Sequence, residues 1–308
     1  MNSLEERIAE LIRKKGPLTG AEIHDHVKDD SLTVWQTCRS ASALETRILG
    51  RRYLRLDSQV EGYARLSPSI LREFLTYSVV GLRDEPEPLE RRKLEIASRI
   101  EAISREKHEL ARRFIEDIRQ HFISVHPHDW PADKLCAILA GDVVYHMAHR
   151  VPRPERSTGK LVDGSDIDLV FVLADDVPDD FAKRLDDTIY KSKHMALVTP
   201  SIREEIDYIV KKMARVEEQL HFDTFKRMIA CKILHEGVLL HGSQAMFSGI
   251  QSRLRILGVA QKLEDMENQA RASREAGEKY LLRYRPEGAM AYEIRKLFYS
   301  AEESEEFD

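Results

Sequence analysis

The chain has 308 residues, with 48 lysines and arginines against 53 aspartates and glutamates, so its formal net charge is −5. This balance excludes a protein that is basic overall, and any nucleic-acid contact must come from a local patch. No apolar run approaches the roughly 20 residues of a membrane-spanning helix, and residues 1–7 are acidic and amphipathic, unlike a signal peptide. The widely separated Cys38, Cys136 and Cys231 predict reduced thiols in a cytoplasmic protein.

The first 67 residues predict a compact module of three short helices and a hairpin. Apolar residues recur at helical spacing over residues 4–12, and Thr19 and Ser31 are suited to cap the next two helices. Residues 51–56 and 63–66 alternate in polarity on either side of a polar turn. This pattern predicts a β-hairpin.

Three helices followed by a hairpin resemble a winged helix-turn-helix domain, which we place at residues 1–83. The resemblance implies contacts to DNA or RNA from the exposed face of the third helix and from the wing. The residues implied are Thr33, Gln36, Thr37 and Arg39 on the helix, and Arg51, Arg52 and Arg55 on the wing. The weak net charge of the module leaves a second interpretation open, in which it binds protein or mediates dimerisation.

Residues 84–124 predict a long, charged linking helix. Apolar side chains from Leu89 to Phe114 fall mostly on heptad positions of a helix that would span Leu89 to Phe122, although Lys93 and Lys107 interrupt one row. A helix of that length would extend about 50 Å. It would form either a short coiled-coil seam in a homodimer or an amphipathic helix that packs on the following domain.

The strongest functional signal lies in residues 164–173. Residues 167–173 are β-branched, aromatic and aliphatic, which predicts a buried strand. Side chains alternate along a strand, so Asp166 and Asp168 point the same way while Ile167 enters the core. Two carboxylates this close repel each other unless a cation lies between them. Hard oxygen ligands favour Mg²⁺ or Mn²⁺, and paired ions of this kind serve phosphoryl and nucleotidyl transfer.

Two neighbouring segments extend this candidate metal site. Upstream, residues 135–142 form an apolar run that ends in Gly141-Asp142, and residues 143–150 predict a helix. Downstream, residues 204–210 predict a third strand with Asp207 near its start. A third carboxylate on a neighbouring strand would complete a two-metal site and would orient or deprotonate an attacking hydroxyl.

From Leu135 to Ser243 the chain resembles the DNA polymerase beta-like nucleotidyltransferase superfamily. The resemblance rests on Gly141, residues 164–169, Asp207 and residues 233–243. It implies that the glycine turn grips a triphosphate, that the first two aspartates hold two Mg²⁺ or Mn²⁺ ions, and that the third serves the nucleophile. Members transfer a nucleoside monophosphate from a nucleoside triphosphate and release pyrophosphate.

The sequence departs from the family at the phosphate turn. The family usually has Gly-Ser or Gly-Gly there, and an aspartate beside a triphosphate needs a metal or a basic residue to offset its charge. The gap between this turn and Asp166 is longer than is usual in the family, and residues 151–160 fill it. Their basic and hydroxyl side chains would either supply charge for binding phosphate or form a solvated surface loop. The residues implied to bind nucleotide are Gly141, Asp142, Arg156, Ser157, Thr158, Lys160 and Ser165.

The predicted fold class is therefore α/β, of the α+β kind, with a mixed-sheet nucleotidyltransferase domain flanked by helices. The predicted segments are a winged helix (1–83), the linking helix (84–124), the nucleotidyltransferase domain (125–245), and C-terminal helices with an acidic tail (246–308). The predicted function is transfer of a nucleoside monophosphate to a hydroxyl, an RNA end being favoured over a protein or a second nucleotide. The alternative is a nucleic-acid-binding regulator with an inactive domain, which Asp142 favours.

Overall fold

The structure is a computed structural model, and it describes residues 3–125, 130–155, 159–199, 202–285 and 291–300. The chain divides into two compact units, one of residues 1–99 with 266–308 and one of residues 100–265. Within the described residues, no helix combines the length and the apolar character that crossing a bilayer requires.

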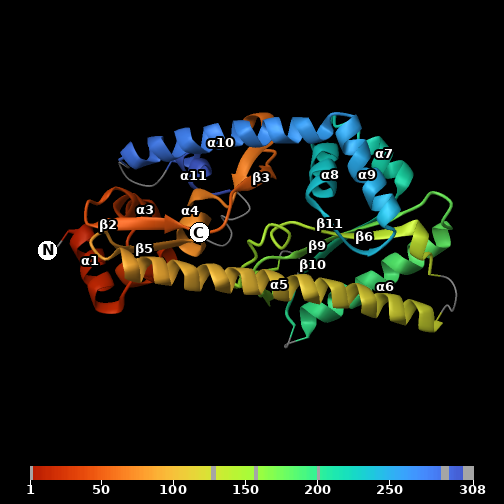
Figure 1. The fold of residues 1–308 in the computed structure, drawn as a ribbon, viewed down its shortest axis with the longest axis horizontal. Coiled ribbons are helices and arrows are strands. Elements are labelled where there is room, and N and C mark those ends of the chain that lie inside the picture. The colour runs from red at the N-terminus through yellow and green to blue at the C-terminus, as the bar shows by residue number, and fades with distance from the viewer. Residues whose placement is uncertain (1–2, 126–129, 156–158, 200–201, 286–290, 301–308) are drawn as a thin grey trace. The chain divides into compact units, whose positions relative to one another are not determined.

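The first unit contains a three-stranded antiparallel sheet with strand order β1-β5-β2 and a separate hairpin, β3-β4 (Figure 1). The hairpin is the one that the sequence predicts. The elements are α1 (Leu4–Lys15), β1 (Leu18–Thr19), α2 (Gly20–Val27), α3 (Ser31–Ser40), β2 (Leu44–Ile48), β3 (Tyr53–Leu56), a 3-10 turn (Glu61–Tyr63), β4 (Ala64–Ser67), α4 (Ile70–Thr76) and β5 (Ser78–Leu82).

Side-chain caps explain where these helices begin. Thr19 caps α2 as predicted, because its hydroxyl accepts from the Glu22 amide while the Glu22 carboxylate accepts from the Thr19 amide. The predicted cap of α3 is one residue too late. Asp30 is the N-cap, since its carboxylate accepts from the amide of Thr33.

The end of the chain belongs to the first unit. The final part of α10 (Val259–Arg283) and α11 (Tyr292–Phe298) contribute Leu281 and Phe298 to the core of this unit. The rings of Trp35 in α3 and Phe298 pack edge to face with centroids 5.7 Å apart. The sequence offered no sign of this arrangement, because the pattern of α11 shows an apolar face without showing its partner.

The second unit is built on a four-stranded mixed sheet with strand order β10-β9-β6-β11. β9 and β10 run parallel, and the other neighbours are antiparallel. The strands are β6 (Leu135–Ala140), β9 (Ile167–Leu173), β10 (Ile206–Lys212) and β11 (Val238–Gly242), with a small hairpin of β7 (Arg153–Pro154) and β8 (Leu161–Val162). The sequence predicts β6, β9 and β10 with boundaries within two residues.

Helices cover both faces of this sheet (Figure 1). The second half of α5 (Pro86–Val125) and α6 (Asp179–Val198) bury apolar side chains against Leu139, Leu169 and Phe171. The opposite face carries α8 and its neighbours. These helices are α7 (Met213–Gln219), α8 (Phe225–Glu236) and α9 (Gln244–Ile256), with a 3-10 turn at Ala132–Lys134.

The long predicted helix is present as α5, and its second half is an amphipathic helix packed within the second unit. Ile115, Ile118 and Phe122 are buried in the core of this unit. Lys107, which interrupts the heptad row, is buried as well, where its ammonium pairs with Glu204 and donates to the carbonyl of Asp163. The row is therefore interrupted because a buried ion pair, rather than an apolar contact, lies at that position.

The predicted helix at residues 143–150 is wrong. The structure has a turn there, in which the amide of Val144 donates to the carbonyl of Gly141 and His146 adopts a left-handed φ of 58°. A left-handed residue ends any helical run. Val143, Met147 and Ala148 are buried, so the apolar spacing that suggested a helix reflects packing of a turn on the core.

Lys211 in β10 gives a first testable prediction. Its ammonium is buried and donates to Gln219 Oε1 at 2.7 Å, and burial lowers the pKa of Lys211 from 10.5 to about 8. Above pH 8 the folded chain releases this proton while the unfolded chain keeps it, so Lys211 makes stability rise with pH up to 10.5. The rise is about 3 kcal/mol by linkage.

Urea unfolding midpoints at pH 7.5 and pH 10, compared between the native chain and Lys211→Met, measure this slope. Other groups titrate in both proteins, so the difference between the two slopes is the informative quantity. We expect the substitution to remove most of the Lys211 contribution. Equal slopes in the two proteins would contradict the assignment.

Candidate metal centre

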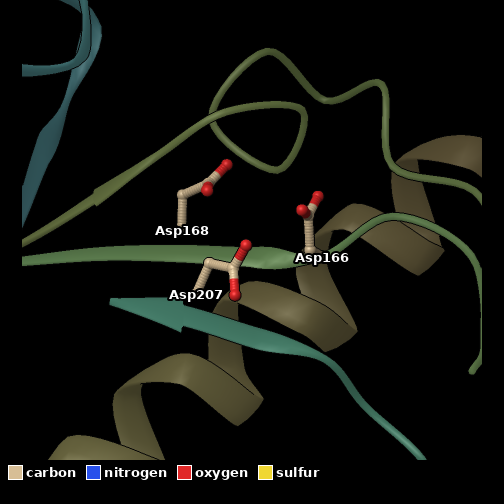
Figure 2. A group of neighbouring side chains, drawn as sticks. All are labelled: Asp166, Asp168 and Asp207. Atoms are coloured by element: carbon tan, nitrogen blue, oxygen red, sulfur yellow. The ribbon is translucent and has the colours of Figure 1, made fainter. Parts of the chain in front are cut away.

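Three aspartates converge at one end of the parallel strand pair. Asp168 in β9 and Asp207 in β10 are register partners, and Asp166 directly precedes β9. Each offers a carboxylate oxygen, and these oxygens all lie within 4.8 Å of one another. Figure 2 shows the three carboxyl groups turned toward a common space. Their convergence follows from the period of two along β9 and from the parallel register of β10.

The environment of the cluster disfavours the ionised form of its carboxyl groups. Burial raises the pKa of Asp168 well above its ordinary value, and the carboxylates of Asp166, Asp207, Asp142 and Glu236 raise it further. Burial also raises the pKa of Asp166, while the guanidinium of Arg153 opposes that shift. A divalent cation would reverse this electrostatic cost, and carboxylate oxygens are the donors that Mg²⁺ and Mn²⁺ prefer. The donor set therefore fits such an ion.

Two glycines near the cluster lie where a side chain would clash with a neighbouring atom. Gly141, directly after β6, has φ +75°, and a Cβ at this position would lie 2.2 Å from Asp168 Oδ2. Gly164, two residues before Asp166, has φ +77°, and a Cβ there would lie 1.9 Å from the carbonyl oxygen of His149. Only glycine meets both demands at either place.

The turn at Gly141 is held by a carboxylate that the sequence did not single out. The amide of Gly141 donates to Glu236 Oε1 at 3.2 Å, and the other Glu236 oxygen lies 2.5 Å from the Lys232 ammonium. Glu236 and Lys232 both lie near the C-terminal end of α8. The only signal was Glu236-Gly237 in the closing stretch, and that signal gave no role for either side chain.

Asp142 and Ser165 contact each other. The Ser165 hydroxyl donates to Asp142 Oδ2 at 3.1 Å and accepts from the amide of His149 at 3.2 Å. Ser165 is buried. The hydroxyl therefore offsets part of the negative charge that Asp142 adds beside the aspartate cluster.

The segment before Asp166 forms a small hairpin, and Arg153 is its contact with the cluster. Arg153 donates to the Gly164 carbonyl at 2.9 Å, and its guanidinium lies 2.8 Å from Glu205 Oε2 and 3.8 Å from Asp166 Oδ2. Lys160 is exposed, and its carbonyl closes the hairpin with the Glu155 amide at 2.8 Å. The predicted nucleotide-binding residues Arg156, Ser157 and Thr158 lie outside the described residues.

A second cation reaches the cluster from α6. The Lys193 ammonium lies 2.8 Å from Asp207 Oδ1. Sequence reasoning missed this residue, because the helical pattern of α6 shows only which face is apolar and does not show that Lys193 extends to the neighbouring strand.

The residues predicted to contact nucleic acid do not form one exposed face. Arg39 and Arg51 are exposed, while Thr33, Thr37 and Arg55 are half-buried. The expected exposure is wrong for Gln36, and Arg52 is held in ion pairs. Gln36 is buried and donates to the carbonyls of Leu281 and Tyr284 at 2.6 and 2.8 Å, and Arg52 lies 2.6 Å from Glu73 and 2.7 Å from Glu278. The C-terminal segment explains both differences, since α10 supplies partners to each.

Gln36 therefore acts on stability, and this is a second prediction. Its amide serves the carbonyls of Leu281 and Tyr284 at the C-terminal end of α10, where the helical hydrogen-bond ladder runs out. Gln36→Ala should lower the free energy of unfolding by about 1–3 kcal/mol because a buried bond is lost. Arg39→Ala, an exposed change on the same helix, should leave it nearly unchanged. Urea unfolding of both variants is the measurement, and equal midpoints would contradict the placement of Gln36.

Comparisons of this chain with protein-family models, with curated proteins and with solved structures found no match.

Proposed function

We propose that the chain is a divalent-metal-dependent nucleotidyltransferase that moves a nucleoside monophosphate from a nucleoside triphosphate to a hydroxyl. The observation that supports the proposal most directly is the convergence of Asp166, Asp168 and Asp207 within 4.8 Å on two adjacent parallel strands. The steric demand for glycine at position 141, against Asp168 Oδ2, adds a second feature that a chance pair of acids would not need.

The residues would divide the work as follows. Asp166 and Asp168 would hold two Mg²⁺ or Mn²⁺ ions, and Asp207 would complete the shell of one of them. When bound, the ions would neutralise the charge on the transferring phosphate. Asp207 would orient the acceptor hydroxyl and accept its proton. The acceptor oxygen then bonds to the α-phosphorus, the bond from this phosphorus to the β-phosphate oxygen breaks, and pyrophosphate leaves.

The turn after β6 would supply a backbone donor for the triphosphate. The Gly141 amide now donates to Glu236, whose carboxylate would have to yield that donor to a phosphate oxygen. Lys232, the ion-pair partner of Glu236, would then be released toward the same oxygens. Ser165 and the segment with Lys160 complete the proposed nucleotide site.

The first unit would be a winged helix with an insertion in its wing. The strand order β1-β5-β2 with three helices supports this interpretation, and the β3-β4 hairpin and α4 would be the insertion between β2 and β5. Because the C-terminal segment covers Gln36, any DNA or RNA contact would use Arg39, Arg51 and Arg55 rather than the middle of α3. An RNA end is the acceptor that such a neighbour favours.

Labelled nucleotides test the proposal. The full chain is incubated with Mg²⁺, cellular RNA and each nucleoside triphosphate, labelled on either the α- or the γ-phosphate, with Asp168→Asn as control. We expect the α-label on an acceptor and the γ-label in pyrophosphate, with native protein only. Absence of both labels from products, under every nucleotide and acceptor, would overturn the enzyme proposal. Retention of a specific nucleic-acid fragment without turnover would favour the regulator instead.

A further inference from the structure

The ammonium of Lys193 contacts one of the three aspartates of the candidate metal site, Asp207. α6 is anchored in the core by Ile189 and Ala196, and Lys193 follows Ile189 by one helical turn. Its side chain is 28% exposed and that of Asp207 is 51% exposed, so water reaches both partners of the pair. The contact is therefore open to exchange with solvent ions.

The position of β10 allows this contact. β10 is the edge strand of the sheet, and α6 runs along it, with the Tyr208 hydroxyl donating to the Asp186 carbonyl at 3.3 Å. Tyr208 packs on the core that contains α6, while Asp207 points to the other face of the strand. Lys193 consequently reaches past the sheet edge to Asp207 Oδ1.

We propose that Lys193 is a displaceable counter-ion, a positioning residue that occupies Asp207 until a divalent cation takes its place. This inference rests on the proposed function, because it assumes that the three aspartates bind metal. In the metal-free chain, the ammonium offsets part of the repulsion among three carboxylates. Two bound divalent ions would reverse the local charge and repel the ammonium.

The magnitudes favour displacement over a permanent structural pair. An ion pair between partly exposed side chains contributes only about 0.2–1 kcal/mol. Coordination of a carboxylate oxygen to a divalent ion is much stronger than that, since the ion carries twice the charge at a shorter distance. Lys193 therefore lowers metal affinity modestly, by making the metal compete for Oδ1.

Titration with Mn²⁺ alone tests this proposal without any substrate. Free Mn²⁺ is followed by its electron paramagnetic resonance signal in the presence of the native chain, Lys193→Met, Lys193→Arg and Lys191→Met. Lys191→Met is the matched control, because it removes an exposed ammonium from the same helix. Circular dichroism melting of each variant confirms that the variants are folded.

We expect Lys193→Met to bind Mn²⁺ about two- to fivefold more tightly than the native chain. Lys193→Arg and Lys191→Met should bind within the error of the native value. Equal or weaker binding by a folded Lys193→Met would overturn the counter-ion proposal while leaving the metal site intact. If the native chain and all variants fail to bind Mn²⁺, the proposed function fails instead, so the two failures are distinguishable.

Discussion

Asp168→Asn is expected to reduce the proposed nucleotidyl transfer roughly a thousandfold or more, because it removes a carboxylate that would hold the ions neutralising the transferring phosphate. Pyrophosphate release at saturating Mg²⁺ is the measurement. Asp187→Asn, which removes an exposed carboxylate from α6, is the charge-matched control and should retain native activity.

The same variant should be more stable than the native chain when metal is withheld. The pKa of Asp168 is raised in the folded state. At pH values just above the ordinary pKa of aspartate, the folded state therefore binds more protons than the unfolded state. Stability without metal should therefore fall as pH rises through that window, and Asp168→Asn should flatten the fall. Mg²⁺ should raise the melting temperature of the native chain only. A variant that is inactive and also less stable than the native chain would indicate a structural role for Asp168.

Gly141→Ala is expected to abolish metal binding and to reduce transfer roughly a thousandfold or more, as Asp168→Asn does, because the proposed reaction depends on the metal. The added Cβ would lie 2.2 Å from Asp168 Oδ2, so the carboxylate must turn out of the cluster. The left-handed φ of +75° adds backbone strain, which alone costs about 1–2 kcal/mol of stability.

Gly159→Ala separates these two effects. Gly159 has a similar left-handed φ of +66°, but nothing lies within 4 Å of a Cβ built there. Both variants should therefore lose stability through strain, whereas only Gly141→Ala should lose Mn²⁺ binding. Native metal affinity in a folded Gly141→Ala would show that Asp168 can leave its observed position at no cost, and the cage geometry would then be wrong.

The candidate site was predictable to the extent that it depends on local periodicity. Side chains alternate between the two faces of a strand, so Asp166 and Asp168 point to the same side. The seven residues of β9 are enough to predict this. Asp207 required more, namely that two apolar runs pair in parallel and in register. The run of residues 204–210 predicted the strand with Asp207 near its start, but the pairing of Asp207 with Asp168 came only from the structure.

The sequence did not reveal which distant side chains contact the aspartate cluster. Glu236 and Lys193 reach the cluster from two helices whose sequences show only amphipathic patterns, so their contacts depend on how those helices pack. The same limit explains Gln36, which looks exposed on α3 until the end of α10 covers it. A turn replaced the helix at residues 143–150, because burial imposed apolar spacing on a segment whose backbone visits the left-handed region at His146.

The central claim is that Asp166, Asp168 and Asp207 cage divalent cations, and anomalous diffraction tests it most directly. Crystals of the native chain and of Asp168→Asn are soaked in millimolar MnCl₂, and data are collected at the manganese absorption edge. The native chain should show anomalous peaks among the three carboxylates, at about 2.2 Å from their oxygens, and the variant should show none. A native map without a peak there, from a crystal that binds Mn²⁺ elsewhere, would contradict the account.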